Sequence, residues 1–394
     1  MTQTNDPFLS FRKMRLAGQV IHDPAIGKWF VIGADESRQV LHNADDFPVI
    51  DAERMDETQP GWRRSRGEAH KYSLLPFINP PSHTRLRRLI ARDLTVRKVE
   101  LLRPLIERET DRALDELAAQ GRDGTPADYL GLVAYPVTVA VIGALVGVPP
   151  EDWRTFRAWS DCLVMLTDPR ITEEEKARAD KAAEDFETYV EELVAERRVT
   201  PRDDLISDYL AVRDHDPEQL TDAELCNSVL LLVLAGYVTT ADSLGNAMHA
   251  LLSHPDQFQQ LVEDPSLVGD VVDEVLRWAS PVQIVQRTAA KDVSLGGVDL
   301  PAESTVLVMP GAANRDSNGC PHADDFDISR KAGYGLAFGA GIHFCLGMAL
   351  AKVELTTVLG RFAARFPEAR FASRPVRRES AGLAGYATLD VIIS

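Results

Sequence analysis

The sequence predicts a mainly α-helical fold with small peripheral β-sheets. Residues 81–277 show long helical periodicity and are rich in Leu, Ala, Arg and Glu, which indicates a helical body. Short β-branched segments precede this body, and similar segments return from residue 281 onward. Because the 45% of hydrophobic residues are spread evenly over 394 positions, one large core is expected. We therefore expect a single domain over residues 1–394, β-richer to about residue 80, helical over about 81–280, and made of β hairpins, a loop and a final helix over about 281–394.

The β-type segments are recognised by their β-branched residues and by the turn residues around them. A Gly-Gly pair at residues 296–297 suits the tight turn of a hairpin. The irregular stretch 311–341, rich in Gly, Asn and Asp, is long enough to be expected to have a function. The expected strands lie at residues 29–32 and near Val40 and Val49, and then at residues 293–300, 304–308 and 390–393.

Charge and cysteine content restrict the class of protein and partner. With 43 basic and 60 acidic residues the formal net charge is -17, which argues against nucleic acid or an anionic membrane as the main partner. The four cysteines lack the spacing of a zinc site, and residues 1–15 contain no apolar signal segment. These features favour a cytoplasmic protein, which we expect to be a monomer.

One uncharged stretch is long enough to cross a bilayer. It covers the 22 residues 129–150, but it contains three glycines and three prolines, and its flanks lack basic anchors. A buried helix that ends at Pro149 and Pro150 fits this stretch better. The uncharged run 229–238 has the length of a buried core helix, so no membrane contact is expected.

A single cysteine lies among glycines just before a helical run, in the stretch Phe-Gly-Ala-Gly-Ile-His-Phe-Cys-Leu-Gly at residues 338–347. Backbone N–H groups turned toward a thiolate in such a loop allow a protein to hold haem iron through one axial cysteine. Cys345 is therefore the candidate axial ligand. A lone cysteine in a tight turn is more often structural, so this assignment depends on the elements that accompany the loop.

Basic side chains occur where a haem site would require them. Haem carries two propionates, and a pocket that excludes water needs cations to pair with them. His83 and Arg87 lie one turn apart on one face of an expected helix that opens near Pro80. Arg287 is expected just before a strand, and His343 belongs to the cysteine loop. These four residues form a candidate propionate-binding set, although each alone would pass for an ordinary surface charge.

Together these elements resemble the cytochrome P-450 family of haem-thiolate monooxygenases, in its soluble bacterial form. The resemblance covers nearly the whole chain, and the cysteine loop is its most specific part. It implies the P-450 fold, a haem b cofactor and an oxidoreductase that activates dioxygen. The motifs that carry it are the cysteine loop, Glu274-x-x-Arg277, Asn314-Arg-Asp316 with Arg330 beyond it, His83-Thr-Arg-Leu-Arg87, and Ala235-Gly-x-x-Thr-Thr240.

The resemblance also implies roles for individual residues. Glu274, Arg277 and Arg330 would brace the loop that presents Cys345, and Phe338 would pack near its sulfur. The thiolate would donate electron density to iron and favour O–O cleavage. The implied haem contacts are His83, Arg87, Ala235, Gly236, Arg287, Phe338, Gly339, His343, Cys345 and Gly347.

Two positions depart from the family pattern. A histidine often found four residues before the loop glycine is Gly335 here, so one propionate contact is expected to be missing. The distal helix has Val238 where similar enzymes carry the acid that delivers protons, and valine has no proton to relay. Thr239 is retained, and its hydroxyl can bond the carbonyl of Ala235 and open the helix where oxygen would bind.

Val238 leaves three interpretations of the reaction open. Water or Asp242, one turn along the same face, would deliver protons for oxygen insertion; a polar group of the substrate would do so; or the reaction is a radical C–C or C–N coupling without oxygen insertion. The catalytic candidates are thus Thr239, Val238 and Asp242. The first hypothesis is hydroxylation or a related monooxygenation in secondary metabolism, such as antibiotic biosynthesis. Coupling is the second, and a haem protein without turnover is the third.

By the same resemblance, the substrate pocket is lined by apolar and polar side chains, which fits a medium-sized, partly polar molecule. The basic stretch 61–67 is either a lid for an anionic substrate or a solvated loop. The predicted substrate contacts are Met165, Leu234, Tyr237, Val238, Val282, Gln283, Ile284, Val285 and Tyr386.

Electrons must come from another protein, because the chain has neither a strand-linked GxGxxG motif nor the cysteine spacing of an iron–sulfur cluster. An acidic ferredoxin, with its ferredoxin reductase, is the expected donor. Its docking surface is predicted to be a locally basic area on an acidic protein. That area comprises Arg85, Arg88, Arg92, Arg97, Lys98 and Lys352.

Overall fold

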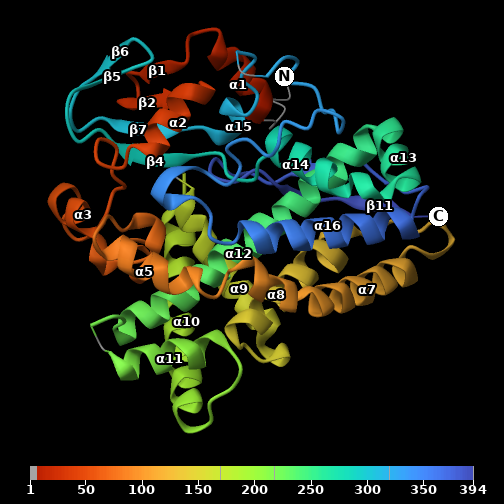
Figure 1. Ribbon diagram of the computed structural model, residues 1–394, viewed down its shortest axis with the longest axis horizontal. Coiled ribbons are helices and arrows are strands. Elements are labelled where there is room, and N and C mark those ends of the chain that lie inside the picture. Colours follow the sequence, from red (N-terminus) through yellow and green to blue (C-terminus); the bar gives the residue numbers. More distant parts are fainter. Residues whose placement is uncertain (1–6, 169, 217, 319, 394) are drawn as a thin grey trace. The chain divides into compact units, whose positions relative to one another are not determined.

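The computed structural model describes residues 7–168, 170–216, 218–318 and 320–393 (Figure 1). Its internal contacts divide the chain into two compact units. The first unit contains residues up to 48, residues 106–136 and the chain from residue 239 onward, and the second contains residues 49–105 and 137–238. Every strand of the described residues lies in the first unit, and the second unit is helical.

The main sheet of the first unit joins the start of the chain to its last third. Its strand order is β1 (Val20–Asp23), β2 (Lys28–Val31), β7 (Thr305–Val308) and β4 (Val285–Thr288). The β2–β7 pair is parallel and the other two pairs are antiparallel. The hydrophobic cluster on this sheet includes Leu41 of the following helix and Ala340 of the cysteine loop. The core of the sheet therefore supports the loop directly.

The predicted hairpin is present as β5 (Val293–Leu295) and β6 (Val298–Leu300). Its turn residues Gly296 and Gly297 both have positive φ, 57° and 77°, a conformation that glycine adopts without steric cost. The prediction was wrong for Val40, which lies in helix α2 (Ala34–His42), and for Val49, which lies in no strand. Apolar β-branched residues in a short segment do not distinguish a buried helix face from a strand.

Short strands close the C-terminal part of the first unit. β3 (Ala127–Asp128), β11 (Asp390–Ile392) and β8 (Arg370–Phe371) form one sheet, and β9 (Val376–Arg377) pairs with β10 (Tyr386–Thr388). The helices of this unit are α1 (Pro7–Arg15), α2, most of α7 (Arg103–Gln120), α13 (Pro255–Glu263), α14 (Val268–Trp278), α15 (Pro310–Ala313) and α16 (Met348–Arg365). Helices α13 and α14 pack on α16.

The second unit is organised around one long helix. Helix α10 (Glu173–Val199) begins with a capping box formed by Thr172 and Glu175, which satisfies two backbone N–H groups. It packs against α4 (Arg66–Lys71), α9 (Trp153–Val164) and α11 (Leu205–His215). The other helices are α3 (Ala52–Thr58), α5 (Ser82–Ala91), α6 (Val96–Leu101) and most of α8 (Tyr135–Val146).

The uncharged stretch 129–150 forms a buried helix, as predicted, because residues 137–143 of α8 are all buried. It ends at Val146 and not at the prolines, since Gly147 takes a left-handed φ of 100°. Helix α12 (Asp222–Ser253) runs through both units. By length and composition it is the one described helix that could cross a membrane, yet 56% of its apolar window is buried, as in a core helix.

Candidate functional site

The cysteine loop precedes α16 and lies on α2. Its backbone turns back on itself, because the N–H of Cys345 donates to the carbonyl of Phe338 at 2.9 Å. Gly339 and Gly341 have positive φ, 71° and 68°. A side chain at Gly341 would overlap the carbonyl oxygen of Leu41, so glycine is required for this close approach. Cys345 itself is exposed.

Aromatic rings pack against one another in and next to the cysteine loop. The rings of Tyr334 and Phe338 meet edge to face with centroids 5.0 Å apart, and those of Phe338 and Phe344 lie 6.5 Å apart. Such edge contacts fix ring orientation as well as burying area. His343 and Gly347 lie on either side of the cysteine and are half-buried.

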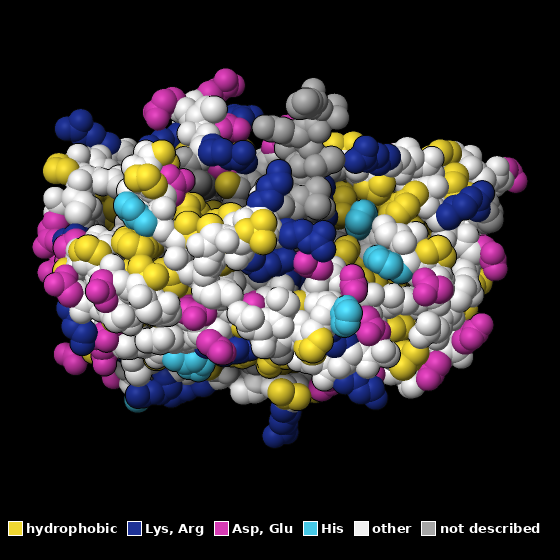
Figure 2. Space-filling view, turned by 90° about the horizontal axis from the view of Figure 1, so that it is seen from above, with side chains coloured by type: hydrophobic (Ala, Val, Ile, Leu, Met, Phe, Trp, Pro, Cys, Tyr) yellow, Lys and Arg dark blue, Asp and Glu magenta, His cyan; other side chains and the backbone are white. Residues whose placement is uncertain are grey.

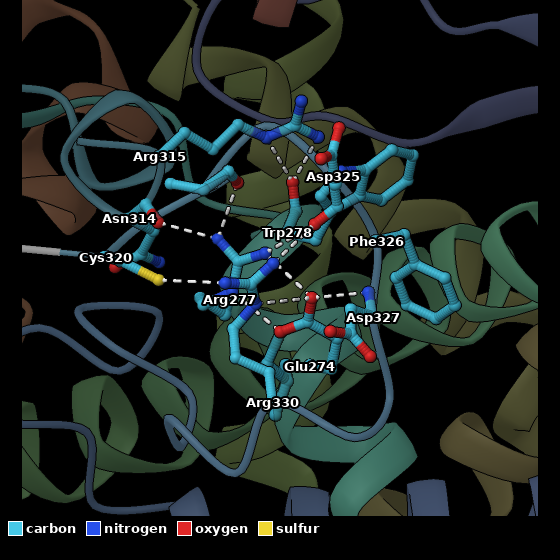
Figure 3. Close-up of polar contacts among 12 residues, drawn as sticks. Glu274, Arg277, Trp278, Asn314, Arg315, Cys320, Asp325, Phe326, Asp327 and Arg330 are labelled. Atoms are coloured by element: carbon cyan, nitrogen blue, oxygen red, sulfur yellow. Dashed lines mark hydrogen bonds and ion pairs between the residues drawn. The ribbon is translucent and has the colours of Figure 1, made fainter. Parts of the chain in front are cut away.

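The structure places Glu274, Arg277 and Arg330 in one buried network (Figure 3). The guanidinium of Arg277 donates to both carboxylate oxygens of Glu274, at 2.7 and 2.8 Å, and Arg330 donates to the same carboxylate at 3.3 Å. Arg277 also donates to the carbonyls of Asn314 and Ala323. The bidentate pair thus ties α14 to the irregular stretch before the cysteine loop.

Asn314 extends this connection to Leu336, two residues before the cysteine loop. Its side chain accepts from the N–H of Leu336 at 2.6 Å and donates to the hydroxyl of Ser280 at 2.9 Å. Next to it, Arg315 donates to the carbonyl of Trp278 at 2.8 Å, and its guanidinium lies 4.4 Å from the centre of the Trp278 ring. The motif 314–316 is therefore a set of positioning side chains in the first unit.

Arg287 is a buried cation in the first unit. It lies inside strand β4, not before a strand as predicted, and only 5% of it is exposed. Burial lowers the pKa of its guanidinium to about 10. Among the described residues no carboxylate forms an ion pair with it, and its guanidinium donates to the carbonyl of Gln286 at 2.8 Å. Burying a guanidinium without a partner anion costs free energy. We therefore expect an anion from outside the polypeptide chain to bind at Arg287.

His83 and Arg87 lie on α5 of the second unit, at the predicted spacing. His83 is 1% exposed and Arg87 is half-buried. The pKa of His83 is lowered by burial and further by the neighbouring Arg87 cation, which keeps this imidazole neutral at pH 7. In the same unit Ala235 is exposed although it lies within an apolar helix, and Gly236 packs against Ile142.

The distal residues follow one another along α12. Val238 is 2% exposed, and the Ser243 hydroxyl donates to the carbonyl of Thr239 at 2.8 Å. The helix is continuous over residues 235–240, so the predicted opening does not break it. Asp242 is buried and pairs with Arg378 at 2.5 Å. This pairing directs the Asp242 carboxylate toward the C-terminal segment, and a role of Asp242 in proton delivery stays a prediction.

Several predicted substrate contacts have other partners. The hydroxyl of Tyr237 donates to Asp161 at 3.1 Å, and Gln283 donates to the carbonyl of Ser280. Tyr386 is 2% exposed, with its ring stacked on His249 and covered by Arg377. Substrate contact by these three side chains stays a prediction.

The remaining predicted contacts are less enclosed. Val282, Ile284 and Val285 are half-buried in the first unit, and Val282 forms a bridge with Leu383. Leu234 and Met165 are half-buried in the second unit, with Met165 in a short 3-10 turn, Met165–Thr167.

One residue of the site region, Arg378, was not found from the sequence, whereas Gly385 belongs to a hairpin tip, residues 385–388, that the family resemblance places near the substrate. Gly385 leaves room for the Asp242 carboxylate, because an added Cβ would overlap it. The sequence did contain one indication of such a partner, namely Asp242, because an acid in an apolar helix requires a partner when it is buried. The sequence does not name that partner, which lies 136 positions away.

The protein-family model described as Cytochrome P450 matches residues 39–369. This chain belongs to the cytochrome P450 family. Among curated P450 relatives, vitamin D(3) 25-hydroxylase of Pseudonocardia autotrophica is 39% identical over 85% of this chain and 81% of its own. The 6-deoxyerythronolide B hydroxylase of Saccharopolyspora erythraea is 35% identical over 86% of this chain and 83% of its own.

Solved P450 structures share the fold over almost the whole length. P450BioI in complex with an acyl carrier protein carrying hexadec-9Z-enoic acid matches with a TM-score of 0.91 and 28% identity, over 98% of both chains. CxnD, described as a P450 for C–S bond formation in chuangxinmycin biosynthesis, matches with a TM-score of 0.86 and 27% identity, over 99% of this chain and 95% of its own. The predicted fold class is thus confirmed.

The cofactor of this P450 is haem b, held by the axial thiolate of Cys345. The residues present fit this group. Cys345 is exposed and lies just before helix α16, so its thiolate is accessible to a haem iron. The buried Arg287, which lacks an anion among the described residues, matches a propionate. The protein is a P450-type monooxygenase that uses redox partners and binds small molecules.

Proposed function

We propose that this P450 oxidises a medium-sized, partly polar molecule of secondary metabolism by hydroxylation or a related monooxygenation. The cysteine loop carries the proposal, because its backbone folds back to present one thiolate, Cys345, and the Glu274 network holds the stretch that leads into it. When bound, the haem supplies the activated oxygen. The names of the relatives, which include a vitamin D(3) 25-hydroxylase and a 6-deoxyerythronolide B hydroxylase, favour hydroxylation of a small organic molecule.

The protein's own part is to bind and orient the substrate and to supply protons. Half-buried apolar side chains such as Val282 and Leu234 are the proposed substrate contacts in their respective units. Thr239 is the proposed hydroxyl for oxygen activation. Because Arg378 holds Asp242, we assign proton delivery to water or to a polar group of the substrate.

The experiment for this proposal compares two cysteine variants. Cys345→Ser should lose the red-shifted thiolate band of the ferrous carbon monoxide adduct and all substrate-dependent consumption of reduced pyridine nucleotide. Cys226→Ser, which changes another cysteine, should keep both. Retention of the band in Cys345→Ser would refute the ligand assignment. A normal band without substrate oxidation, in a broad screen of small molecules, would refute the monooxygenase proposal.

Oxidative C–C or C–N coupling is the second candidate, and Val238 favours it. A buried valine at this position cannot deliver protons, and a coupling reaction needs less of this relay. CxnD, with the same fold, forms a C–S bond. Because the relatives are enzymes, a haem protein without turnover has less support.

Val238→Glu separates the two candidates. If the enzyme inserts oxygen, a carboxylate here should improve proton delivery, lower the peroxide leak and raise the hydroxylated product. If it couples, the added acid should divert the reaction from coupled toward hydroxylated product. Val238→Ile keeps the site apolar and serves as the matched control. An unchanged ratio and peroxide leak would leave coupling without its support.

We also propose an acidic ferredoxin as electron donor, in a cytoplasmic and monomeric enzyme. Arg88 and Arg92 on and just after α5, and Arg97 on α6, are exposed, and no described carboxylate pairs with them. Val96 and Leu101 of the same segment are 68% and 75% exposed. Exposed cations beside apolar side chains suit transient docking of an acidic protein.

A further inference from the structure

Tyr334 belongs to none of the motifs above, yet it lies four residues before the cysteine loop. It is half-buried in the first unit, in the irregular stretch that leads into the loop. Glycines flank it on both sides, and both have positive φ, 67° at Gly333 and 59° at Gly335. A backbone with two such glycines has many accessible conformations. The side-chain contacts of Tyr334 therefore restrict this stretch to one of them.

The first of these contacts is with the cysteine loop. The rings of Tyr334 and Phe338 meet edge to face, with centroids 5.0 Å apart and planes at 78°. The carbonyl of Phe338 accepts the N–H of Cys345 at 2.9 Å. A displacement of the Phe338 residue would therefore reach the backbone of the cysteine directly.

The second contact is with the helix that follows the loop. The ammonium of Lys352, on α16, lies 5.3 Å from the centre of the Tyr334 ring. This distance is within the range of a cation–π contact. The tyrosine ring thus joins the stretch before Cys345 to the helix after it.

Lys352 is itself held in position by another helix. Its ammonium lies 2.6 Å from the carboxylate of Asp273 on α14, and the two side chains are 30% and 26% exposed. Contacts from two different elements therefore fix this ammonium. Lys352 was predicted to belong to the ferredoxin-docking area, and these contacts direct it to Asp273 and Tyr334 instead.

We propose that Tyr334 is a positioning residue for the axial thiolate of Cys345. Its ring, fixed by the Lys352 ammonium, holds Phe338 in place. The stretch before the loop and the helix after it are thereby held together across the cysteine. The proposal concerns the haem ligand and does not depend on whether the enzyme hydroxylates or couples.

Loss of the tyrosine ring has a predictable effect on the haem-loaded enzyme. A displaced Phe338 would let water approach the sulfur of Cys345. Hydrogen bonds and solvent at a ligating sulfur change the reduction potential of the iron. They stabilise the reduced state, which carries one more negative charge, so the potential should rise.

The test follows the ferrous carbon monoxide adduct and the reduction potential of haem-loaded variants. Tyr334→Leu should lose the red-shifted thiolate band about two- to tenfold faster than the native protein, the effect of losing one aromatic pair. It should also raise the potential in a redox titration. Tyr334→Phe keeps the ring and both of its contacts, so it should match the native protein in both readouts.

Phe371→Leu is the control for loss of a ring elsewhere. Phe371 is half-buried in β8 of the same unit, where its ring lies 5.8 Å from that of His249. This variant should leave the decay of the band and the potential unchanged.

Variants of Lys352 test the same contact without removing the tyrosine. Lys352→Met removes the cation and should speed the decay of the band, whereas Lys352→Arg keeps a cation over the ring and should not. In a Tyr334→Leu background Lys352→Met should have no further effect, because the ring that the cation holds is gone.

The proposal is overturned if Tyr334→Leu decays at the native rate, or if Phe371→Leu changes both readouts as much as Tyr334→Leu. An effect of Lys352→Met that persists undiminished without the tyrosine ring would also overturn it. If Tyr334→Leu does not fold, equal decay rates of Lys352→Met and Lys352→Arg decide against it. In each case a normal thiolate band in the native protein leaves the assignment of Cys345 as the ligand intact.

Discussion

Gly335 stands where the family often has a histidine, and the local backbone explains this departure. Gly335 has a φ of 59°, and a Cβ there would overlap the side-chain oxygen of Asn314. That oxygen accepts the N–H of Leu336. A histidine at this position would therefore strain the backbone and disturb the Asn314 contact. The loss of one basic side chain increases the importance of the other cations proposed for the propionates.

Arg287 is the first of these cations to test. Arg287→Gln should release haem to apomyoglobin about ten- to hundredfold faster, because a charge-assisted hydrogen bond contributes roughly 1.5–3 kcal/mol. The guanidinium is charged at pH 7 although burial lowers its pKa to about 10, and a bound anion should raise that pKa again. The measurement is the rate of haem transfer at neutral pH.

Arg374→Gln is the control for this experiment, since Arg374 is exposed and no described residue forms a hydrogen bond or ion pair with it. Equal transfer rates for the two variants would remove Arg287 from the haem site. A slower rate for Arg287→Gln would mean that the buried charge destabilises the bound state.

At the scale of elements, one face of α12 fastens the C-terminal segment. Asp242 pairs with Arg378, the amide of Asn246 donates to the carbonyl of Ala384 at 3.0 Å, and His249 stacks on Tyr386. The three residues of α12 are spaced by four and three positions, so they form one stripe on the helix. This stripe positions the segment that faces Val282.

Gly385→Ala should destabilise the protein by about 1–3 kcal/mol, because the new methyl group would overlap a buried carboxylate that Arg378 holds in place. Urea unfolding measures the change. Gly269→Ala on α14 is the control, since no atom lies within 4 Å of an added Cβ there; it should be neutral or slightly stabilising.

A double variant checks the cause of this effect. In an Asp242→Ala background the carboxylate is gone, so Gly385→Ala should cost much less than in the native protein. Equal costs in both backgrounds would mean that the strain arises elsewhere in the segment.

These elements show which parts the sequence predicts and why. The cysteine loop and the Glu274–Arg277 pair each lie within a short segment of the sequence. The spacing of residues within each segment was therefore sufficient to predict them. The turn at Gly296 and Gly297 was predictable for the same reason. The partners of Asp242 and Tyr237 were not, because long-range packing selects them and no local pattern records that choice.

At the scale of the whole molecule, the net charge is -17, and a few exposed cations form no ion pair with any described residue. On the face shown in Figure 2, basic and acidic side chains are interspersed with apolar ones.

Ion pairs within the protein reduce the number of cations that the predicted docking area can offer to a partner. Arg85 pairs with Glu224, Lys98 with Asp93, and Lys352 with Asp273 in its own unit. Arg88, Arg92 and Arg97 remain available.

Replacing Arg88 and Arg92 with Glu should slow reduction by ferredoxin about tenfold at low salt, because electrostatic steering is lost. Stopped-flow reduction at several salt concentrations measures this rate. The native rate should fall with salt, and that of the double variant should depend on salt less steeply.

The control for docking is a pair of charge reversals elsewhere, Arg178→Glu on α10 and Arg374→Glu near β9. Both residues are exposed, and the pair changes the net charge of the molecule by the same amount. If this pair slows reduction as much as the change at Arg88 and Arg92, net charge governs the rate and the docking surface lies elsewhere.

The Glu274 network has a consequence for recombining such enzymes. Its carboxylate accepts from Arg277 three positions away, from the N–H of Asp327 and from Arg330. A chimaera that imports residues 338–347 alone would separate the loop from the side chains that hold its approach. A crossover before residue 274 would transfer the loop together with this support, so the smallest exchangeable block is close to the last third of the chain.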